Sequence, residues 1–213
     1  MKSAFEQETG ITIREIIGSS GKFVSQIENG APFDLFLSAD MDYPDALYRG
    51  GLTHTAPKIY VYGTLVLWTF SDLDLSKGVD VLNQPSVKKV AIANPKTAPY
   101  GRQAVNVLKY FKLYGAVSKK LVYGESIAQV NQFITTGSGD VGFTAKSVVL
   151  APNMKEKGKW VEVDKDAYEP IAQGVIILKY AEQHNLSAAQ KFYEFLFSEQ
   201  AKEIYQKYGY ILP

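Results

Sequence analysis

The sequence has no cysteine among its 213 residues. This absence excludes disulfide bonds, thiolate metal ligands and a cysteine nucleophile. Histidine is nearly absent too, because His54 and His184 are the only two, and they lie in polar stretches without the spacing of a metal-binding pair. We expect both histidines to be surface residues.

Long hydrophobic runs are also missing, since no apolar stretch approaches the roughly 18 residues that a membrane span needs. Neither sign of charge is in excess: 23 Lys and Arg face 22 Asp and Glu, a formal net charge of +1. No basic stripe typical of nucleic-acid-binding proteins stands out. At 46% hydrophobic residues the composition is that of an ordinary globular protein, long enough for one large domain or two lobes.

What the chain does have is an alternation of two apolar patterns. Runs typical of strands occur at residues 11–17, 33–37, 59–70, 87–93, 122–124, 140–144, 160–163 and 170–178. Helical spacing occurs at residues 1–8, 41–48, 101–113, 126–134, 187–197 and 199–208, and in a short helix that starts near residue 20 and ends near residue 30. Gly10 is the expected C′ residue of the first helix. Strands that alternate with helices predict an α/β fold with mostly parallel, doubly wound sheets.

Two long β segments, residues 59–70 and 170–178, bracket the middle third of the chain. Paired crossover segments of this kind allow one lobe to be inserted into another, with a hinge between them. We predict a discontinuous lobe I, residues 1–65 and 174–213, and an inserted lobe II, residues 66–173. The ligand of such sheets binds at the carboxyl ends of the strands, which predicts a cleft between the lobes.

The segment Gly18-Ser19-Ser20-Gly21-Lys22 marks a turn from strand to helix. Hydroxyl groups and unpaired amides at a helix N-terminus favour an anion. A phosphate-binding P-loop does not fit, because Ile16 stands where its first glycine is needed and Phe23 where its serine or threonine is needed.

Three further turns resemble the first: residues 94–101 before one helix, 124–127 with Ser126 as the expected N-cap, and 142–147 after a strand. Amide donors near Tyr100 and at Ile127 are then expected to face a cleft. Such a cage of neutral donors suits a tetrahedral dianion, since it buries no permanent cation when the ligand leaves. We interpret Lys22 and Lys96 as rim charges that steer the anion.

Several of these segments resemble the molybdate-binding component of bacterial ABC transporters. The most specific is Gly30-Ala31-Pro32-Phe33-Asp34-Leu35-Phe36-Leu37-Ser38-Ala39-Asp40. The others are Gly18-Ser19-Ser20, Pro99-Tyr100-Gly101-Arg102-Gln103-Ala104, Val141-Gly142-Phe143-Thr144-Ala145 and the terminal residues 201–210. The resemblance covers nearly the whole chain.

The resemblance implies a two-lobed periplasmic-binding-protein type II fold that closes around molybdate or tungstate and delivers it to a membrane permease. By position it assigns side-chain donors to Ser20 and Ser19 and backbone donors to Tyr100 and Ile127. Ser126 is an additional candidate. Ala145 stands where some members use a tyrosine hydroxyl. The resemblance further implies a periplasmic monomer with no catalytic residue, no cofactor and no metal site apart from the oxyanion site itself.

The chain departs from the family at its start. Members begin with a strand and a serine turn before the helix at residues 1–8, so we expect lobe I to lack its first strand and the chain to show no signal peptide. We expect this to weaken or abolish oxyanion binding, since one or two donors would be lost at about 1.5–3 kcal/mol each.

Other functions stay open at this point. Sulfate, thiosulfate and phosphate are alternative ligands, and cavity size would separate them from molybdate. An effector-binding domain of a transcription regulator shares the two-lobed architecture, although no helix-turn-helix segment is evident. A transferase or phosphatase would need a nucleophile with a base beside it, which the sequence does not offer. We interpret Asp34 and Asp40 as capping residues rather than metal ligands.

Overall fold

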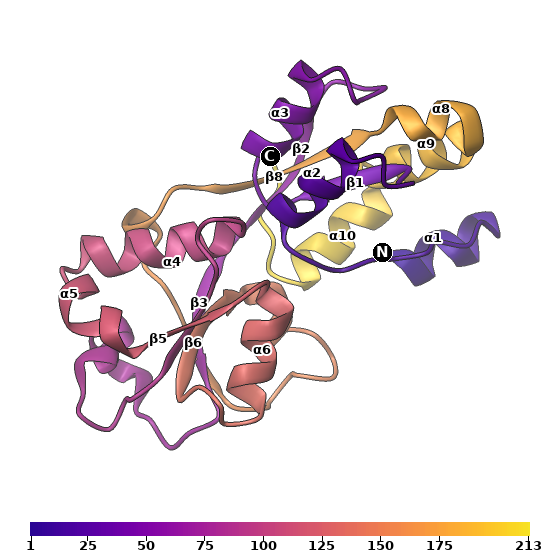
Figure 1. Cartoon of the computed structure of the whole chain (residues 1–213). Helices are drawn as coiled ribbons and strands as arrows, with labels where there is room; N and C mark the ends of the chain where they lie inside the picture. The colour runs from indigo at the N-terminus through magenta and orange to yellow at the C-terminus, as the bar shows by residue number, and fades with distance from the viewer. The chain divides into compact units, whose positions relative to one another are not determined.

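The computed structural model describes residues 1–213, which form two compact units (Figure 1). Unit 1 comprises Met1–Tyr62 and Ala172–Pro213, and unit 2 comprises Gly63–Ile171. These borders differ by two or three residues from those that we set from the sequence. No helix combines the length and the apolar character needed to cross a bilayer.

Unit 1 is built around a three-stranded sheet of order β1-β8-β2. Its strands are β1 (Leu35–Ser38), β8 (Ile171–Ile177) and β2 (Lys58–Gly63), and β1 runs antiparallel to β8 with Phe36 opposite Ile176. Its helices are α1 (Lys2–Thr9), α2 (Ser20–Glu28), α3 (Asp42–Arg49), α8 (Lys179–His184), α9 (Leu186–Phe195) and α10 (Glu199–Lys207).

The core of unit 1 explains why these helices form. Leu47 of α3, 1% exposed, packs with Val24 and Ile27 of α2 against Phe36 and Ile176 of the sheet. Burial of each such side chain contributes about 1.5–3 kcal/mol.

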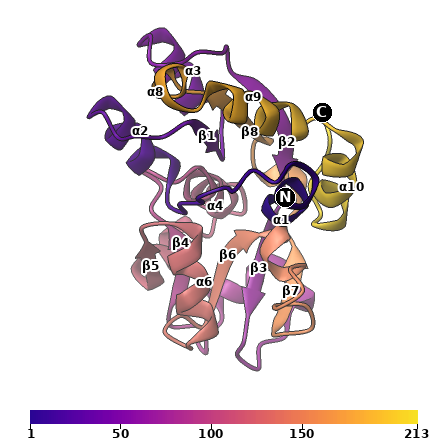
Figure 2. The same cartoon turned by 90° about the vertical axis from the view of Figure 1, so that its right-hand side faces the viewer.

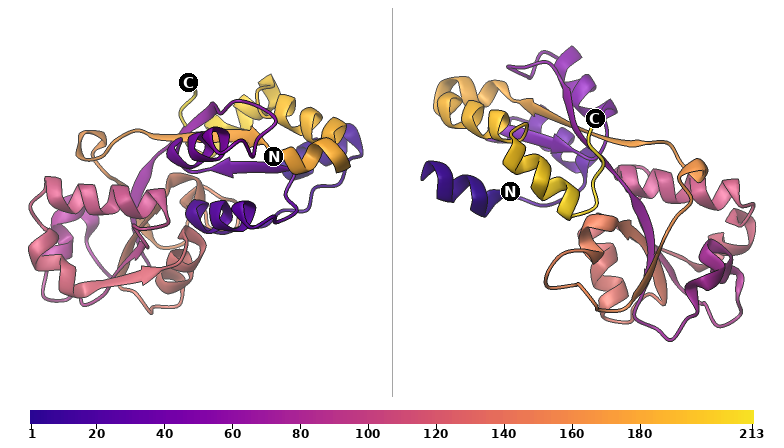
Figure 3. Two further views of the ribbon diagram at one scale, coloured as in Figure 1. Left: turned by 45° about the horizontal axis from the view of Figure 1, so that its top comes forward. Right: turned by 180° about the vertical axis from the view of Figure 1, so that it is seen from behind.

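A second aromatic contact fixes the first helix. Phe5 is fully buried and meets the rings of Phe192 and Phe195 edge-on, at centroid distances of 5.0 and 5.4 Å. The indigo α1 therefore lies beside the orange-yellow helix α9 (Figure 3).

Unit 2 holds a five-stranded sheet of order β5-β4-β6-β3-β7 (Figure 2). The strands are β3 (Leu65–Thr69), β4 (Val90–Ala93), β5 (Leu121–Gly124), β6 (Val141–Ala145) and β7 (Lys159–Glu162). Strand β4 runs parallel to β5 and β6, whereas β3 runs antiparallel to β6 and β7. The helical segments are η1 (Leu75–Asn83), α4 (Pro99–Tyr110), α5 (Tyr114–Val117), η2 (Ser118–Lys120), α6 (Ile127–Thr135), α7 (Lys146–Val149) and η3 (Lys165–Ala167).

The core of unit 2 forms between the sheet and its helices. Trp68 and Ala91 of the sheet are fully buried with Val130 and Ile134 of α6. Strands β3, β4 and β6 are buried at every position, as expected for a sheet covered on both faces.

The α/β fold class is confirmed, with two corrections. The sheets are mixed rather than mostly parallel, because β1 and β8 are antiparallel and β3 runs against both β6 and β7. Residues 11–17 are not a strand: they form no regular secondary structure and have no ladder partner, and Ile16 and Ile17 are 50% and 73% exposed. Gly10 closes α1 in the left-handed conformation (φ 70°), as predicted.

Candidate functional site

In unit 1 the predicted serine turn opens helix α2. Ser19 and Ser20 are only 5% and 6% exposed. Ser19 holds the N-cap position with extended backbone angles (φ −83°, ψ 146°), but its hydroxyl does not cap the helix. Its carbonyl instead accepts from the amide of Phe23, which closes the first turn of the helix. The Ser19 hydroxyl is therefore available to another acceptor.

The second serine is held against the end of strand β1. The Ser20 Oγ accepts a hydrogen bond of 3.1 Å from the backbone N–H of Ala39, which directly follows β1. A hydroxyl has one proton to donate in addition to its acceptor sites, so the proton of Ser20 can serve a ligand. The bond from Ala39 also fixes the serine rotamer, which orients that donor in advance.

In unit 2 three helices start at one edge of the sheet. Strands β4, β5 and β6 are parallel and end at Ala93, Gly124 and Ala145, so their carboxyl ends share this edge. Helices α4, α6 and α7 follow these strands in turn. The structure thus brings together Tyr100, Ile127 and Ala145, which the sequence separates by up to 45 positions.

The start of α4 is built so that its backbone approaches the sheet closely. Ala98 at the N-cap has no side-chain acceptor, and Pro99 has no N–H, which makes the Tyr100 amide the first N–H of the helix. Gly101 allows the approach, because a Cβ at this position would lie 2.1 Å from the carbonyl oxygen of Ala93.

The start of α6 is capped as predicted. The Ser126 Oγ accepts from the amide of Gln129 at 3.4 Å, and the Gln129 Oε1 accepts from the amide of Glu125 at 2.7 Å. The Ile127 amide makes no hydrogen bond within the protein. It belongs to the first turn of the helix, where an N–H points toward an external acceptor.

Ala145 contributes no side-chain donor. It is 6% exposed at the end of β6 and offers only a methyl group. The neighbouring Thr144 is fully buried and donates to the Asn131 Oδ1 at 2.6 Å, which ties β6 to α6. No local pattern predicts this bond, because both residues look like ordinary polar positions in the sequence.

Of the two carboxylates in the specific motif, only Asp40 accepts from an amide at a helix start, so the capping interpretation does not hold for Asp34. The Asp34 oxygens accept from the Asn185 side chain at 3.2 and 3.3 Å. The Asp40 Oδ1 accepts from the Ser38 hydroxyl at 3.1 Å and from the Tyr43 amide at 3.4 Å. No group of three or more His, Cys, Asp or Glu side chains is arranged to hold a metal ion.

The two histidines are exposed, as predicted. The His54 Nδ1 lies 2.8 Å from the Glu182 Oε1, and the His184 ring stacks on Tyr180 at 3.9 Å. The rim lysines Lys22 and Lys96 are exposed as well.

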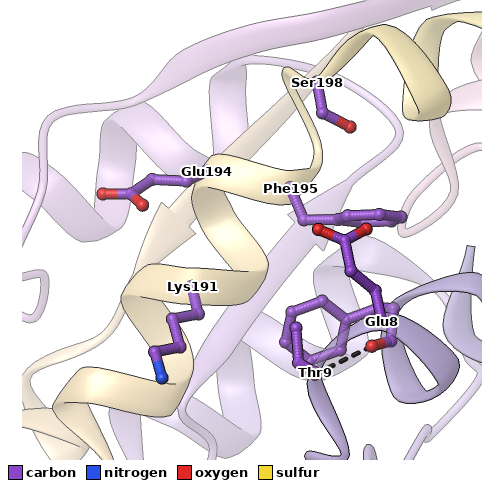
Figure 4. A pocket seen from close by; sticks show the side chains of 7 residues that line it. Glu8, Thr9, Lys191, Glu194, Phe195 and Ser198 are labelled. Atoms are coloured by element: carbon purple, nitrogen blue, oxygen red, sulfur yellow. Dashed lines mark hydrogen bonds between the residues drawn. The ribbon is translucent and has the colours of Figure 1, made fainter.

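Unit 1 also has a pocket of about 300 Å³ between α1 and α9 (Figure 4). Its charged residues are Glu8, Lys191 and Glu194, and its apolar floor includes Phe5 and Phe195. Two carboxylates beside one ammonium repel a dianion, so this pocket does not fit the anion chemistry of the serine turn.

The chain matches known proteins over nearly its whole length. The family described as bacterial extracellular solute-binding protein matches residues 1–211. The molybdate-binding protein ModA of Azotobacter vinelandii is 41% identical over 98% of this chain and 82% of its own length. ModA of Rhodobacter capsulatus is 39% identical over 97% of this chain and 80% of its own length. A solved structure, the periplasmic molybdate-binding protein of Azotobacter vinelandii, aligns with a TM-score of 0.93 at 30% identity, covering 100% of this chain and 92% of that one.

Proposed function

This chain belongs to the family of bacterial extracellular solute-binding proteins, and we propose from its relatives that it binds molybdate in the periplasm and delivers it to an ABC transporter permease. The observation that carries the proposal is the identity of 41% and 39% to two molybdate-binding proteins over nearly the whole chain. Sulfate, phosphate and a regulator's effector are not favoured by these relatives.

We propose that each unit offers the ligand two neutral donors. The hydroxyls of Ser19 and Ser20 serve it from unit 1, and the amides of Tyr100 and Ile127 serve it from unit 2. The buried hydroxyls, the fixed rotamer of Ser20 and the Ile127 amide without a protein partner support this assignment. Hydrogen bonds to a charged ligand are roughly twice as strong as neutral ones, so four donors suffice without a buried cation.

The same chemistry extends to tungstate, which is also a tetrahedral dianion. We propose that Ser126 contributes its hydroxyl as an additional donor, and that Ala145 contributes shape rather than a hydrogen bond. We further propose a monomer that uses no cofactor and catalyses no reaction, since molybdate is cargo in this scheme.

Thermal unfolding with a panel of anions tests the proposal. A ligand that binds only the folded protein raises the melting temperature by mass action. We expect shifts with molybdate and tungstate and none with sulfate or phosphate at the same concentration. A shift with sulfate or phosphate alone would assign a different oxyanion, and no shift with any of the four would contradict the binding function for this chain.

A further inference from the structure

Unit 2 gathers lysines at the edge of its sheet where the parallel strands begin. Lys88 and Lys89 precede β4, and Lys119 and Lys120 precede β5. The two strands are neighbours in parallel register, with Val90 opposite Leu121. Two Lys-Lys pairs that are far apart in the sequence therefore enter the sheet side by side.

Helix α4 adds two more lysines to this edge. It starts at the carboxyl end of β4 and packs on that strand, so its last turn returns to the amino end. Lys109 lies in this last turn, and Lys112 follows it with a left-handed backbone (φ 57°). We call the set the lysine edge: Lys88, Lys89, Lys109, Lys112, Lys119 and Lys120.

The charges of the lysine edge are not neutralised within the protein. Five of its members are exposed, and none belongs to an ion pair. The exception to exposure is Lys120, whose Nζ donates to the carbonyls of Leu82 and Gln84 at 3.0 and 3.1 Å. Those acceptors are neutral carbonyls, so Lys120 is not paired with a carboxylate either.

Few carboxylates lie nearby. Residues 103–124 contain no Asp or Glu. Asp140 sits at the same edge, where its Oδ2 accepts from the amides of Lys88 and Lys89 at 2.7 and 2.8 Å, and its one negative charge offsets only part of the six positive ones. Asp80, in η1, is exposed to solvent. Unit 2 as a whole has 14 Lys and Arg against 10 Asp and Glu.

Exposed aromatic rings lie among these lysines. Tyr110 and Tyr114 are 55% and 38% exposed, and the Tyr110 ring meets Phe111 at 5.1 Å. Burial and then the nearby Tyr114 phenol raise the pKa of Tyr123, which is half exposed on the edge strand β5. Tyrosine has an apolar ring and a polar tip, and it is enriched where membrane meets water.

We propose that the lysine edge and its aromatic rings form a surface that binds anionic phospholipid bilayers. Lysines near an anionic membrane each strengthen adsorption, and amphipathic aromatic rings insert at the headgroup level. All six cations are lysine rather than arginine, which suits diffuse attraction to many headgroups better than bidentate recognition of a single phosphate. The surface lies at the opposite edge of the unit 2 sheet from Tyr100 and Ile127, so it does not depend on the proposed ligand.

Co-sedimentation with lipid vesicles tests the proposal, using the whole chain and vesicles of phosphatidylcholine with or without phosphatidylglycerol. We expect binding only to the phosphatidylglycerol vesicles, and loss of binding at high salt because exposed charges are screened. Each lysine near an anionic surface is worth about fivefold in partitioning, so the variant K88Q/K112Q/K119Q should bind about 100-fold more weakly. The variant Y110S should bind more weakly at unchanged salt dependence.

The matched control is K2Q/K191Q/K207Q, which removes three exposed lysines from unit 1 and should bind like the parent protein. Equal loss in the two triple variants would overturn the proposal, since net charge alone would then explain the binding. Equal binding to both kinds of vesicle would also overturn it. So would binding to a single-stranded oligonucleotide without binding to phosphatidylglycerol, because the surface would then serve nucleic acid.

Discussion

Replacement of Ser20 by alanine separates a ligand donor from a structural residue. The Ser20 Oγ accepts from the Ala39 amide at 3.1 Å, and its proton is the proposed donor to the anion. Ser20→Ala removes both interactions and leaves the helix start otherwise intact, because the first turn of α2 is closed by the Ser19 carbonyl.

The two losses differ in size. A hydrogen bond to a charged ligand is worth about 1.5–3 kcal/mol, which corresponds to a rise in Kd of about 10- to 150-fold. The neutral bond from the Ala39 amide is worth about 1 kcal/mol, so the melting temperature without ligand should fall by only a few degrees. Ser20→Ala should therefore reduce the affinity for molybdate far more than it reduces the stability of the fold.

Isothermal titration calorimetry with molybdate measures the first effect, and thermal unfolding without ligand measures the second. Ser25→Ala is the matched control, since Ser25 lies in the same helix, is exposed and makes no side-chain hydrogen bond. A Kd for Ser20→Ala within about twofold of the Ser25→Ala value would refute the role of Ser20 as a donor.

Three further substitutions probe other parts of the structure. Gly101→Ala favours the helix by propensity, but its Cβ would lie 2.1 Å from the Ala93 oxygen, so we expect a loss of about 1–3 kcal/mol in urea unfolding and weaker molybdate binding. Thr144→Val removes the donor to Asn131 and should destabilise unit 2 by about 1–3 kcal/mol, with Thr144→Ser close to the parent protein. Burial raises the pKa of the Tyr205 phenol, so the protonated phenol stabilises the folded state fully at pH values below the unfolded pKa of about 10. This stabilisation is lost as the pH rises from there toward the folded pKa, so melting temperatures measured at increasing pH above about 10 should fall less steeply for Tyr205→Phe than for the parent protein.

The apolar pattern predicts much of the fold, but the strand that it predicts at residues 11–17 does not form. Residues 11–17 have isoleucine at four positions, which favours a strand, yet Ile16 and Ile17 are exposed and no ladder forms. Alternation identifies which side chains share a face, but a strand also needs partners for its backbone groups. Strand direction is hidden for a similar reason: the antiparallel course of β3 depends on how the chain crosses between sheets, and no residue period reports it.

The candidate site was predictable only where local chemistry points to it. Capping residues such as Ser126 predict where a helix starts, and the capping bond of Ser126 is confirmed. Contacts between distant segments have no such signal, and the Ala39 amide that orients Ser20 is 19 positions away in the chain. The lysine edge was missed for the same reason, because its pairs become a surface only when β4 and β5 align.

Under both proposals, unit 2 interacts with anions in two physically different ways at the two edges of one sheet. At the carboxyl edge, helix starts present oriented N–H and O–H groups, whose fixed geometry can distinguish one oxyanion from another. At the amino edge, flexible exposed ammonium groups supply attraction that acts over about 10 Å and is indifferent to shape. Lysines in the donor site would retain any anion, whereas neutral donors at the lysine edge would not attract a charged surface from a distance. The parallel arrangement of β4, β5 and β6 makes this separation available, since these three strands start at one edge and the helices that follow them start at the other.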